Sequence, residues 1–293
     1  MINDDIQKQE SGDNSLNQQT NSGNNTVNNI TINQYLISKN NAPGELTELY
    51  TDNATICRHN AEKIALKRVE EINSALIDAI IAEPNNANMI FERMNEPDMQ
   101  MAIFEAQKSY AKYGDDTKMQ LFVKLLIGKG KEQCNSLKNI LLDDAINTVS
   151  KLNQQHIDFL SFLVYKFCFI SSNIADVNEL YQNHIKKIIP YAYTLNILGN
   201  DALKFLEQFL CVEVSKFNII DCNIVDMIAR QVSLLFPSAN NLKQELYRVD
   251  PNLEQIIETD IRMPAIYLTP LGTMIGLKNI ELKTGDILDW SFK

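Results

Sequence analysis

Glycine and proline are scarce in this 293-residue sequence, which contains 10 Gly and 8 Pro. Folds made of many short strands need frequent turns, and turns depend largely on these two residues. Hydrophobic residues make up 45% of the chain and charged residues 22%, which is enough apolar material to form a core. The scarcity therefore favours helices, and we predict a mainly α fold.

Long apolar runs are also missing. The longest, Ile157–Ile170, contains Asp158 and Lys166 and is shorter than the roughly 20 residues that a helix needs to cross a bilayer. The opening residues Met1–Asp5 show neither the basic nor the apolar part of a secretory signal. We expect no membrane span and a cytoplasmic location.

Basic residues are outnumbered, because 27 Lys and Arg face 37 Asp and Glu, and the formal net charge is −10 at pH 7. An excess of acid repels phosphate backbones, so nucleic acid is not an expected partner. The cysteines are odd in number and widely spaced, at positions 57, 134, 168, 211 and 222. This pattern does not fit a disulfide framework, and we expect them to be small buried hydrophobic residues.

Only three histidines occur: His59, His156 and His184. Cys57 and His59 lie close together, but no second pair follows at the spacing of a zinc site. A Gly-rich dinucleotide turn and a nucleophile elbow are both missing. The sequence therefore predicts no catalytic residue, no metal site and no cofactor.

Two short strings bear a superficial likeness to functional motifs. Gly128–Lys131 lacks the spacing and the Ser or Thr of a phosphate-binding loop, so we expect a loop with two solvated lysines that ends a helix. Pro97–Asp98 and Glu105–Gln107 share residue types with a restriction-nuclease signature. They fall in a helical pattern, however, and that chemistry needs strands that present metal-binding carboxylates. Neither string indicates an active site.

The sequence does contain an internal repeat. Residues 11–21 and 22–32 align without gaps as two copies of an 11-residue unit. The identical positions are Ser11/Ser22, Gly12/Gly23, Asn14/Asn25, Asn17/Asn28 and Thr20/Thr31. Gly and Asn tolerate positive φ, so each unit is expected to form a tight turn that leads into a short segment with apolar or β-branched residues.

Stacked turn-strand units of this kind form small solenoids or cross-β layers in which Asn side chains make ladders. Because two copies bury too little to fold and about three are usually required, we predict that the segment assembles by stacking against copies from other chains. A polar tail that serves only solubility and a stable fold of its own are the alternatives. The residues predicted to carry the assembly are Asn14, Asn17, Asn25, Val27, Asn28, Ile30 and Ile32.

The repeats begin Ser-Gly-Asp-Asn-Ser and Ser-Gly-Asn-Asn-Thr. They resemble the Gly-Asp-Asn-Ser repeats that precede the effector or sensor parts of some bacterial conflict proteins. They are also similar to the repeat motifs of amyloid-type signalling. The resemblance implies self-assembly and a role in a conflict system, phage defence included.

After a linker at 40–44 the spacing of apolar residues becomes helical. A long helix from about Tyr50 to Pro84 is expected to end at the proline. Its apolar stripe consists of Ile56, Ile64, Val69, Ile72, Leu76 and Ile80. Gly114 is expected to end a later helix, Asp115 or Asp116 to cap the next, and Asn153 to cap another. Residues 45–236 are therefore predicted to form a multi-helix bundle.

The C-terminal part, 237–293, changes character again. Ala265–Thr269, a Pro270–Gly272 turn and Met274–Leu282 are predicted to form a small β-hairpin. The string Tyr-Leu-Thr-Pro-Leu-Gly within it resembles the end of a winged-helix module. The helix that would read DNA in such a module is acidic here, so a protein-docking or structural wing is favoured.

Three strings in the chain are similar to a poorly characterised family of mostly helical bacterial proteins. They are Pro97–Asp98, Ala111–Asp115 and Leu152–Leu160. Members often carry a comparable Gly-Asp-Asn segment, and the resemblance covers about two thirds of the chain. It implies a helical fold but supplies no reaction, cofactor or catalytic residue.

These observations predict a chain of three parts: a low-complexity Asn-rich repeat segment with its linker (1–44), a helical body (45–236) and a winged-helix-like module (237–293). The expected function is that of a protein-interaction or adaptor protein that docks a protein partner and self-associates through its repeats. Two alternatives stay open. One is an enzyme whose site gathers His156 or His184 with carboxylates only in three dimensions, and the other is a winged-helix regulator.

Overall fold

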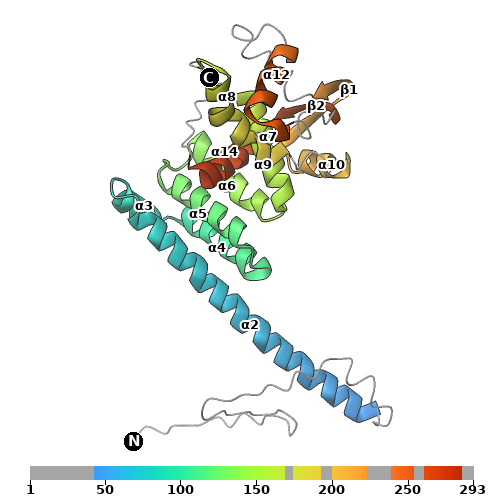
Figure 1. The fold of residues 1–293 in the computed structure, drawn as a ribbon. Coiled ribbons are helices and arrows are strands. Elements are labelled where there is room, and N and C mark those ends of the chain that lie inside the picture. The colour runs from blue at the N-terminus through green and yellow to red at the C-terminus, as the bar shows by residue number, and fades with distance from the viewer. Residues whose placement is uncertain (1–42, 169–173, 193–199, 223–238, 254–260, 286–293) are drawn as a thin grey trace, which may run out of the picture. The chain divides into compact units, whose positions relative to one another are not determined.

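A computed structural model of the chain describes residues 43–168, 174–192, 200–222, 239–253 and 261–285 (Figure 1). Two compact units divide it, Met1–Lys67 and Arg68–Lys293. Their boundary falls inside the first described helix, so each unit is considered by itself. The residues predicted to carry assembly, from Asn14 to Ile32, lie outside the described residues.

The fold is mainly helical, as the sequence predicts, and a small antiparallel sheet accompanies the helices. The helices are α2 (Pro43–Ile81), α3 (Ala87–Arg93), α4 (Pro97–Tyr113), α5 (Asp116–Gly130), α6 (Leu137–Val149), α7 (Gln154–Cys168), α8 (Val177–Leu180), the π-helical η1 (Tyr181–Ile185), α9 (Lys186–Ala192), α10 (Asn200–Gln208), α12 (Ala239–Val249), the 3-10 helix η3 (Pro251–Leu253) and α14 (Pro270–Thr284). The strands are β1 (Val212–Cys222) and β2 (Ile261–Leu268).

Local sequence signals set the ends of several helices, as predicted. Gly114 follows α4 with a φ of 63°, which a glycine adopts without strain. The Asp115 side chain accepts a hydrogen bond from the backbone N–H of Lys118, and Ser136 does the same for Asn139 at the start of α6. Asn153 caps α7 by accepting from the backbone N–H of His156 at 2.9 Å.

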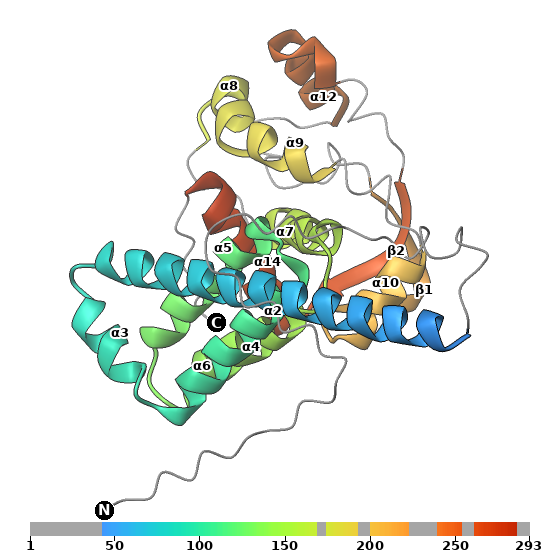
Figure 2. The same cartoon turned by 90° about the horizontal axis from the view of Figure 1, so that it is seen from below.

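Helix α14 lies in the core, where it packs against α5, α6 and α7 (Figures 1 and 2). Its side chains Ile275, Leu277 and Ile280 are buried. Gly276 allows the closest approach to α7, because a Cβ there would lie 2.6 Å from Val164 Cγ2 and 2.8 Å from the Leu160 carbonyl oxygen. The helix is buried around most of its circumference, as expected of a helix surrounded by others.

The predicted C-terminal β-hairpin is therefore wrong for residues 270–282. Thr269 and Pro270 do not make a hairpin turn but start α14, because the Thr269 hydroxyl accepts from the Gly272 N–H at 3.1 Å and Pro270 occupies the first turn, where its missing N–H costs nothing. The strand that precedes it, β2, pairs instead with β1. The register joins Val212 to Leu268 and Ile220 to Met263, with an irregularity between Val214 and Ile219.

Burial changes along helix α2. In the second unit Ile72, Leu76 and Ile80 are buried in the core, as the apolar stripe predicts. In the first unit Ile56 and Ile64 of the same stripe are exposed. In the second unit the stripe is therefore part of the core.

The expectation of buried cysteines is correct for Cys211 and wrong for Cys57 and Cys134, which are exposed. Burial raises the pKa of the Cys211 thiol to about 12, so this side chain behaves as an apolar residue at neutral pH. Within the ranges that the structure describes, no helix combines the length and the apolarity that crossing a bilayer demands.

We predict that Gly276→Ala destabilises the protein, because the new methyl group would collide with the α7 backbone at Leu160, which cannot yield as a side chain can. The expected loss is about 1–3 kcal/mol in the free energy of unfolding, measured by chemical denaturation. Gly128→Ala is the matched control, since its Cβ would meet the flexible Leu142 side chain at 3.3 Å. Equal stability of the two variants would show that the α7–α14 contact is looser than described.

Candidate functional site

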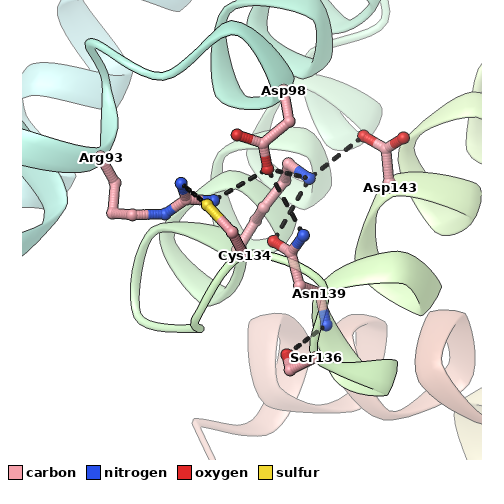
Figure 3. A network of polar contacts seen from close by, with 7 residues as sticks. Arg93, Asp98, Cys134, Ser136, Asn139 and Asp143 are labelled. Atoms are coloured by element: carbon pink, nitrogen blue, oxygen red, sulfur yellow. Dashed lines mark hydrogen bonds and ion pairs between the residues drawn. The ribbon is translucent and has the colours of Figure 1, made fainter.

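Lys129 is the most deeply buried charged residue that the structure describes, with 1% of its surface exposed. It lies one residue before the end of α5. Its Nζ is 3.2 Å from Asp98 Oδ2 on α4, 3.3 Å from Asp143 Oδ1 and 3.3 Å from Asn139 Oδ1, the last two on α6 (Figure 3). Three oxygen atoms, two of them from carboxylates, thus lie within 3.3 Å of Nζ.

Asp98 connects this lysine to an arginine. Arg93, at the end of α3, donates from Nη2 to Asp98 Oδ2 at 2.8 Å and from Nη1 to the Sγ of Cys134 (Figure 3). Asn139 donates its side-chain amide to the same carboxylate oxygen at 3.4 Å. Four helices, α3 to α6, thus meet at a single carboxylate.

The charges within this cluster balance. Burial favours the protonated form of Asp98, but the hydrogen bonds from Arg93 and Lys129 and the charge of Lys129 outweigh it and lower the pKa of Asp98 to about 2. Asp98 is therefore ionised at neutral pH, and together with Asp143 it offsets the two cations. Compensation of this kind is what allows charges to persist away from water.

The cluster is suited to holding helices together and not to proton transfer. A carboxylate with a pKa of about 2 is a weak base. We therefore assign it a positioning role: it fixes α4 against α5 and α6.

The prediction of a loop with two solvated lysines at Gly128–Lys131 is wrong. Gly130 is needed for close packing against α3, since a Cβ there would lie 2.8 Å from Ile90 Cγ2, whereas a Cβ at Gly128 would lie 3.3 Å from the flexible Leu142 side chain of α6. Lys129 is buried for the same reason, because the glycines let α3 and α6 approach this part of α5. Lys131, beyond the helix end, forms an ion pair with Glu83 at 2.7 Å and is one third exposed.

A second polar cluster ties α7 to α14. Asp158 Oδ1 accepts from Gln154 Nε2 at 2.8 Å, from Asn279 Nδ2 at 3.0 Å and from Lys283 Nζ at 2.6 Å. The fully buried Asn279 also donates to Ser161 Oγ at 2.7 Å. These contacts orient the two helices that pack most closely in the core.

The histidines lie apart from one another and in structural positions. His156 forms a reciprocal cap with Asn153, whose backbone N–H donates to His156 Nδ1 at 3.3 Å, and its ring stacks on Phe205 of α10 at 5.0 Å. His184 is buried in η1, and His59 is exposed on α2. Burial lowers the pKa of both His156 and His184, and Lys118 and Lys187 respectively add to the effect.

Among the residues whose placement is described, no group of three or more His, Cys, Asp or Glu side chains is arranged to hold a metal ion. His156 is not joined to a carboxylate by any hydrogen bond within the described part of the chain.

An exposed apolar surface is found on α2 and α4, which run antiparallel. Their register is fixed by Arg68 Nη1 donating to the Ala111 carbonyl at 2.9 Å and by Gln107 Nε2 donating to Asn73 Oδ1 at 2.7 Å. As residue numbers fall along α2 from Asn73 to Arg68, they rise along α4 from Gln107 to Ala111. The Asn73–Gln107 hydrogen bond joins the two helices next to their exposed apolar residues.

From this bond, two lines of apolar side chains extend in the same direction. Ile77 and Ile81 follow Asn73 at intervals of four residues, while Phe104 and Met101 precede Gln107 at intervals of three, and such spacings lie on one helix face. All four side chains are exposed, by 45% for Ile77, 64% for Ile81, 61% for Met101 and 54% for Phe104. We call these four residues the apolar strip.

The model of an uncharacterised protein family, whose description names no activity, matches residues 37–257, about three quarters of the chain. The chain belongs to this family. The match begins after the repeats at 11–32 and covers α2 to α12, which includes the Lys129 cluster and the apolar strip. A search of the curated proteins finds no match, and a search of the solved structures finds none either.

The sequence analysis did not single out the apolar strip, although a signal was present. Ile77 and Ile81 stand off the buried stripe of Ile72, Leu76 and Ile80 by about a quarter of a turn or more of helix. Together with Phe104 and Met101 on α4 they make a group of exposed apolar residues, and such groups indicate an interaction surface where single residues do not.

We predict that Lys129→Met lowers the free energy of unfolding by about 3 kcal/mol, because it leaves Asp98 and Asp143 close together without the charge between them. Lys131→Met is the matched control, and loss of its partly exposed ion pair should cost about 1 kcal/mol or less. Urea denaturation of both variants measures the difference. A cost below that of the control would contradict the positioning role.

We also predict that His156 contributes to acid sensitivity. Because its pKa is lowered in the fold, the unfolded chain binds the proton more readily, so the stabilisation is complete above pH about 6.5 and is lost as the pH falls below it. His156→Gln retains an acceptor for the Asn153 N–H but does not titrate, and it should show a smaller loss of stability between about pH 7 and 5.

His59→Gln, at an exposed position of α2, is the control for this comparison and should leave the pH dependence unchanged. Thermal unfolding across the pH range distinguishes the variants. Parallel curves for the wild type and His156→Gln would exclude His156 as the titrating group.

Proposed function

We propose that this protein is a non-enzymatic interaction protein, an adaptor whose helical body docks a protein partner and whose N-terminal repeats mediate self-assembly. The observation that carries the proposal is the apolar strip, which consists of four exposed large apolar side chains on two helices joined at the Asn73–Gln107 bond. The likeness of the repeats to those of bacterial conflict proteins supports a role in a conflict or stress system, and we propose a cytoplasmic location.

Single exposed apolar residues are common on protein surfaces and need no explanation. A group of them on neighbouring helices is different, because every such side chain exposed to water reduces solubility without adding to the core. The strip also rests on a rigid support, since α4 is fixed by the Lys129 cluster and α2 by Arg68 and Asn73. A surface of this kind is suited to partner binding because little ordering is needed on contact.

The buried polar groups support the same class of function. The charged groups of Lys129, Asp98 and Asp158 contact side chains of other helices in the body, as described above. The string expected to form a wing folds as α14 within the core, so the proposal does not draw on DNA reading.

Self-assembly through the repeats predicts that the full-length chain forms larger particles than residues 42–293 alone. Replacing Val27 and Ile30 together with Asp should reduce the particles to the size of the truncated chain, because charge at stacked positions repels between copies. Light scattering on the purified proteins measures the mass.

Gln19→Asp with Asn29→Asp is the control, since it adds the same charge to the same segment at positions not expected to stack against apolar side chains. This variant should assemble more readily than Val27→Asp with Ile30→Asp. If all four proteins have the mass of the truncated chain, the repeats are a passive tail and the assembly half of the proposal fails.

A further inference from the structure

We infer that the apolar strip is the docking site for one amphipathic helix of another protein, with basic residues beside the apolar face of that helix. The inference rests on the proposed function and names the chemistry of the partner that the helical body binds. It is drawn from the shape of the strip and from the charges at its edge.

The shape favours a helix. In helical bundles, apolar residues exposed on two antiparallel helices are covered by a further helix that packs across both of them. Along α2 the strip and the Asn73–Gln107 bond extend from Asn73 to Ile81, which corresponds to about 12 Å, or two turns of helix. A partner helix with apolar residues at i, i+3 or i+4, and i+7 matches this length.

The side chains of the strip suit this mode of binding. Ile77 and Phe104 are the strip residues closest in sequence to the Asn73–Gln107 bond. A single apolar side chain of the partner helix would contact both of them. Met101 is unbranched and flexible, so it can adapt to the shape of what it meets.

The edge of the strip is acidic on the α2 side. Glu70 lies on the same helix face as Ile77, seven residues before it, and Asp78 lies one turn before Ile81. Both are exposed, and within the described part of the chain neither forms an ion pair. On the α4 side the charge of Glu105 is offset by Lys108 at 3.3 Å.

These charges select among possible occupants. A second copy of the chain would bring Glu70 and Asp78 towards another acidic surface, and the chain as a whole carries a net charge of −10. Like charges across an interface oppose association, whereas lysines or arginines beside the apolar face of a partner helix would pair with the two carboxylates. The partner is therefore a basic helix of a different protein.

The test uses two labelled 18-residue helical peptides and the full-length protein. Both peptides carry leucines at i, i+3, i+4 and i+7, and one has lysines beside the leucines where the other has glutamates. Fluorescence anisotropy at fixed salt gives the two Kd values. We expect the basic peptide to bind at least tenfold more tightly than the acidic one.

Two pairs of variants identify the surface. Ile77→Asp with Phe104→Asp should weaken binding of the basic peptide at least tenfold. Leu210→Asp with Tyr267→Asp replaces two exposed apolar residues outside the strip, one just before β1 and one in β2, and should not change it. Glu70→Lys with Asp78→Lys should transfer the preference to the acidic peptide. Circular dichroism of each variant checks that the helices are retained.

Several results would overturn the inference: binding of neither peptide, equal binding of both, or equal loss in the two pairs of aspartate variants. A fall in particle mass of Ile77→Asp with Phe104→Asp would assign the strip to a second copy of the chain and overturn it as well. None of these results concerns the repeats, so failure here is distinguishable from failure of the assembly experiment.

Discussion

The ammonium group of Lys129 cannot leave water unless its hydrogens find acceptors, because an uncompensated buried charge costs several kcal/mol. Asp98, Asn139 and Asp143 supply these acceptors, and each has to approach Nζ to within 3.3 Å. The relative positions of α4, α5 and α6 are therefore coupled through one side chain. Arg93 extends the coupling to α3, since it binds the same carboxylate. The positions of the two strip residues on α4, Met101 and Phe104, therefore depend on this arrangement.

The C-terminal helix joins the body by a different principle. Gly276 removes a side chain where the backbones of α7 and α14 approach, and the Asp158 contacts then fix the rotation of one helix against the other. Shape sets the distance, and hydrogen bonds to Asn279 and Lys283 set the orientation. The distance and the orientation both depend on contacts between α7 and α14, which lie far apart in the sequence.

Local signals made part of this structure predictable. Gly114 and Asp115 mark a helix end and a cap through their own backbone and side-chain chemistry, which neighbouring residues suffice to reveal. The start of α14 at Pro270 carries the same kind of signal, but its apolar residues on all sides suit a buried strand as well as a buried helix, and only the packing decides. The burial of Lys129 depends on acceptors more than ten residues away or on another helix, and the pairing of β1 with β2 joins distant segments. Neither the burial of Lys129 nor the pairing of β1 with β2 follows from neighbouring residues, so a local sequence pattern does not predict them.

The position of α14 in the chain has a consequence for synthesis. The apolar faces of α5, α6 and α7 that it covers are made first, since α7 ends at Cys168 and α14 begins at Pro270. While the ribosome adds the segments between them, those faces have no native partner and are exposed to other nascent chains and to chaperones. Contacts of such sequence separation also slow folding, because a long loop must close before the core is complete. The core can therefore be completed only after α14 has been synthesised.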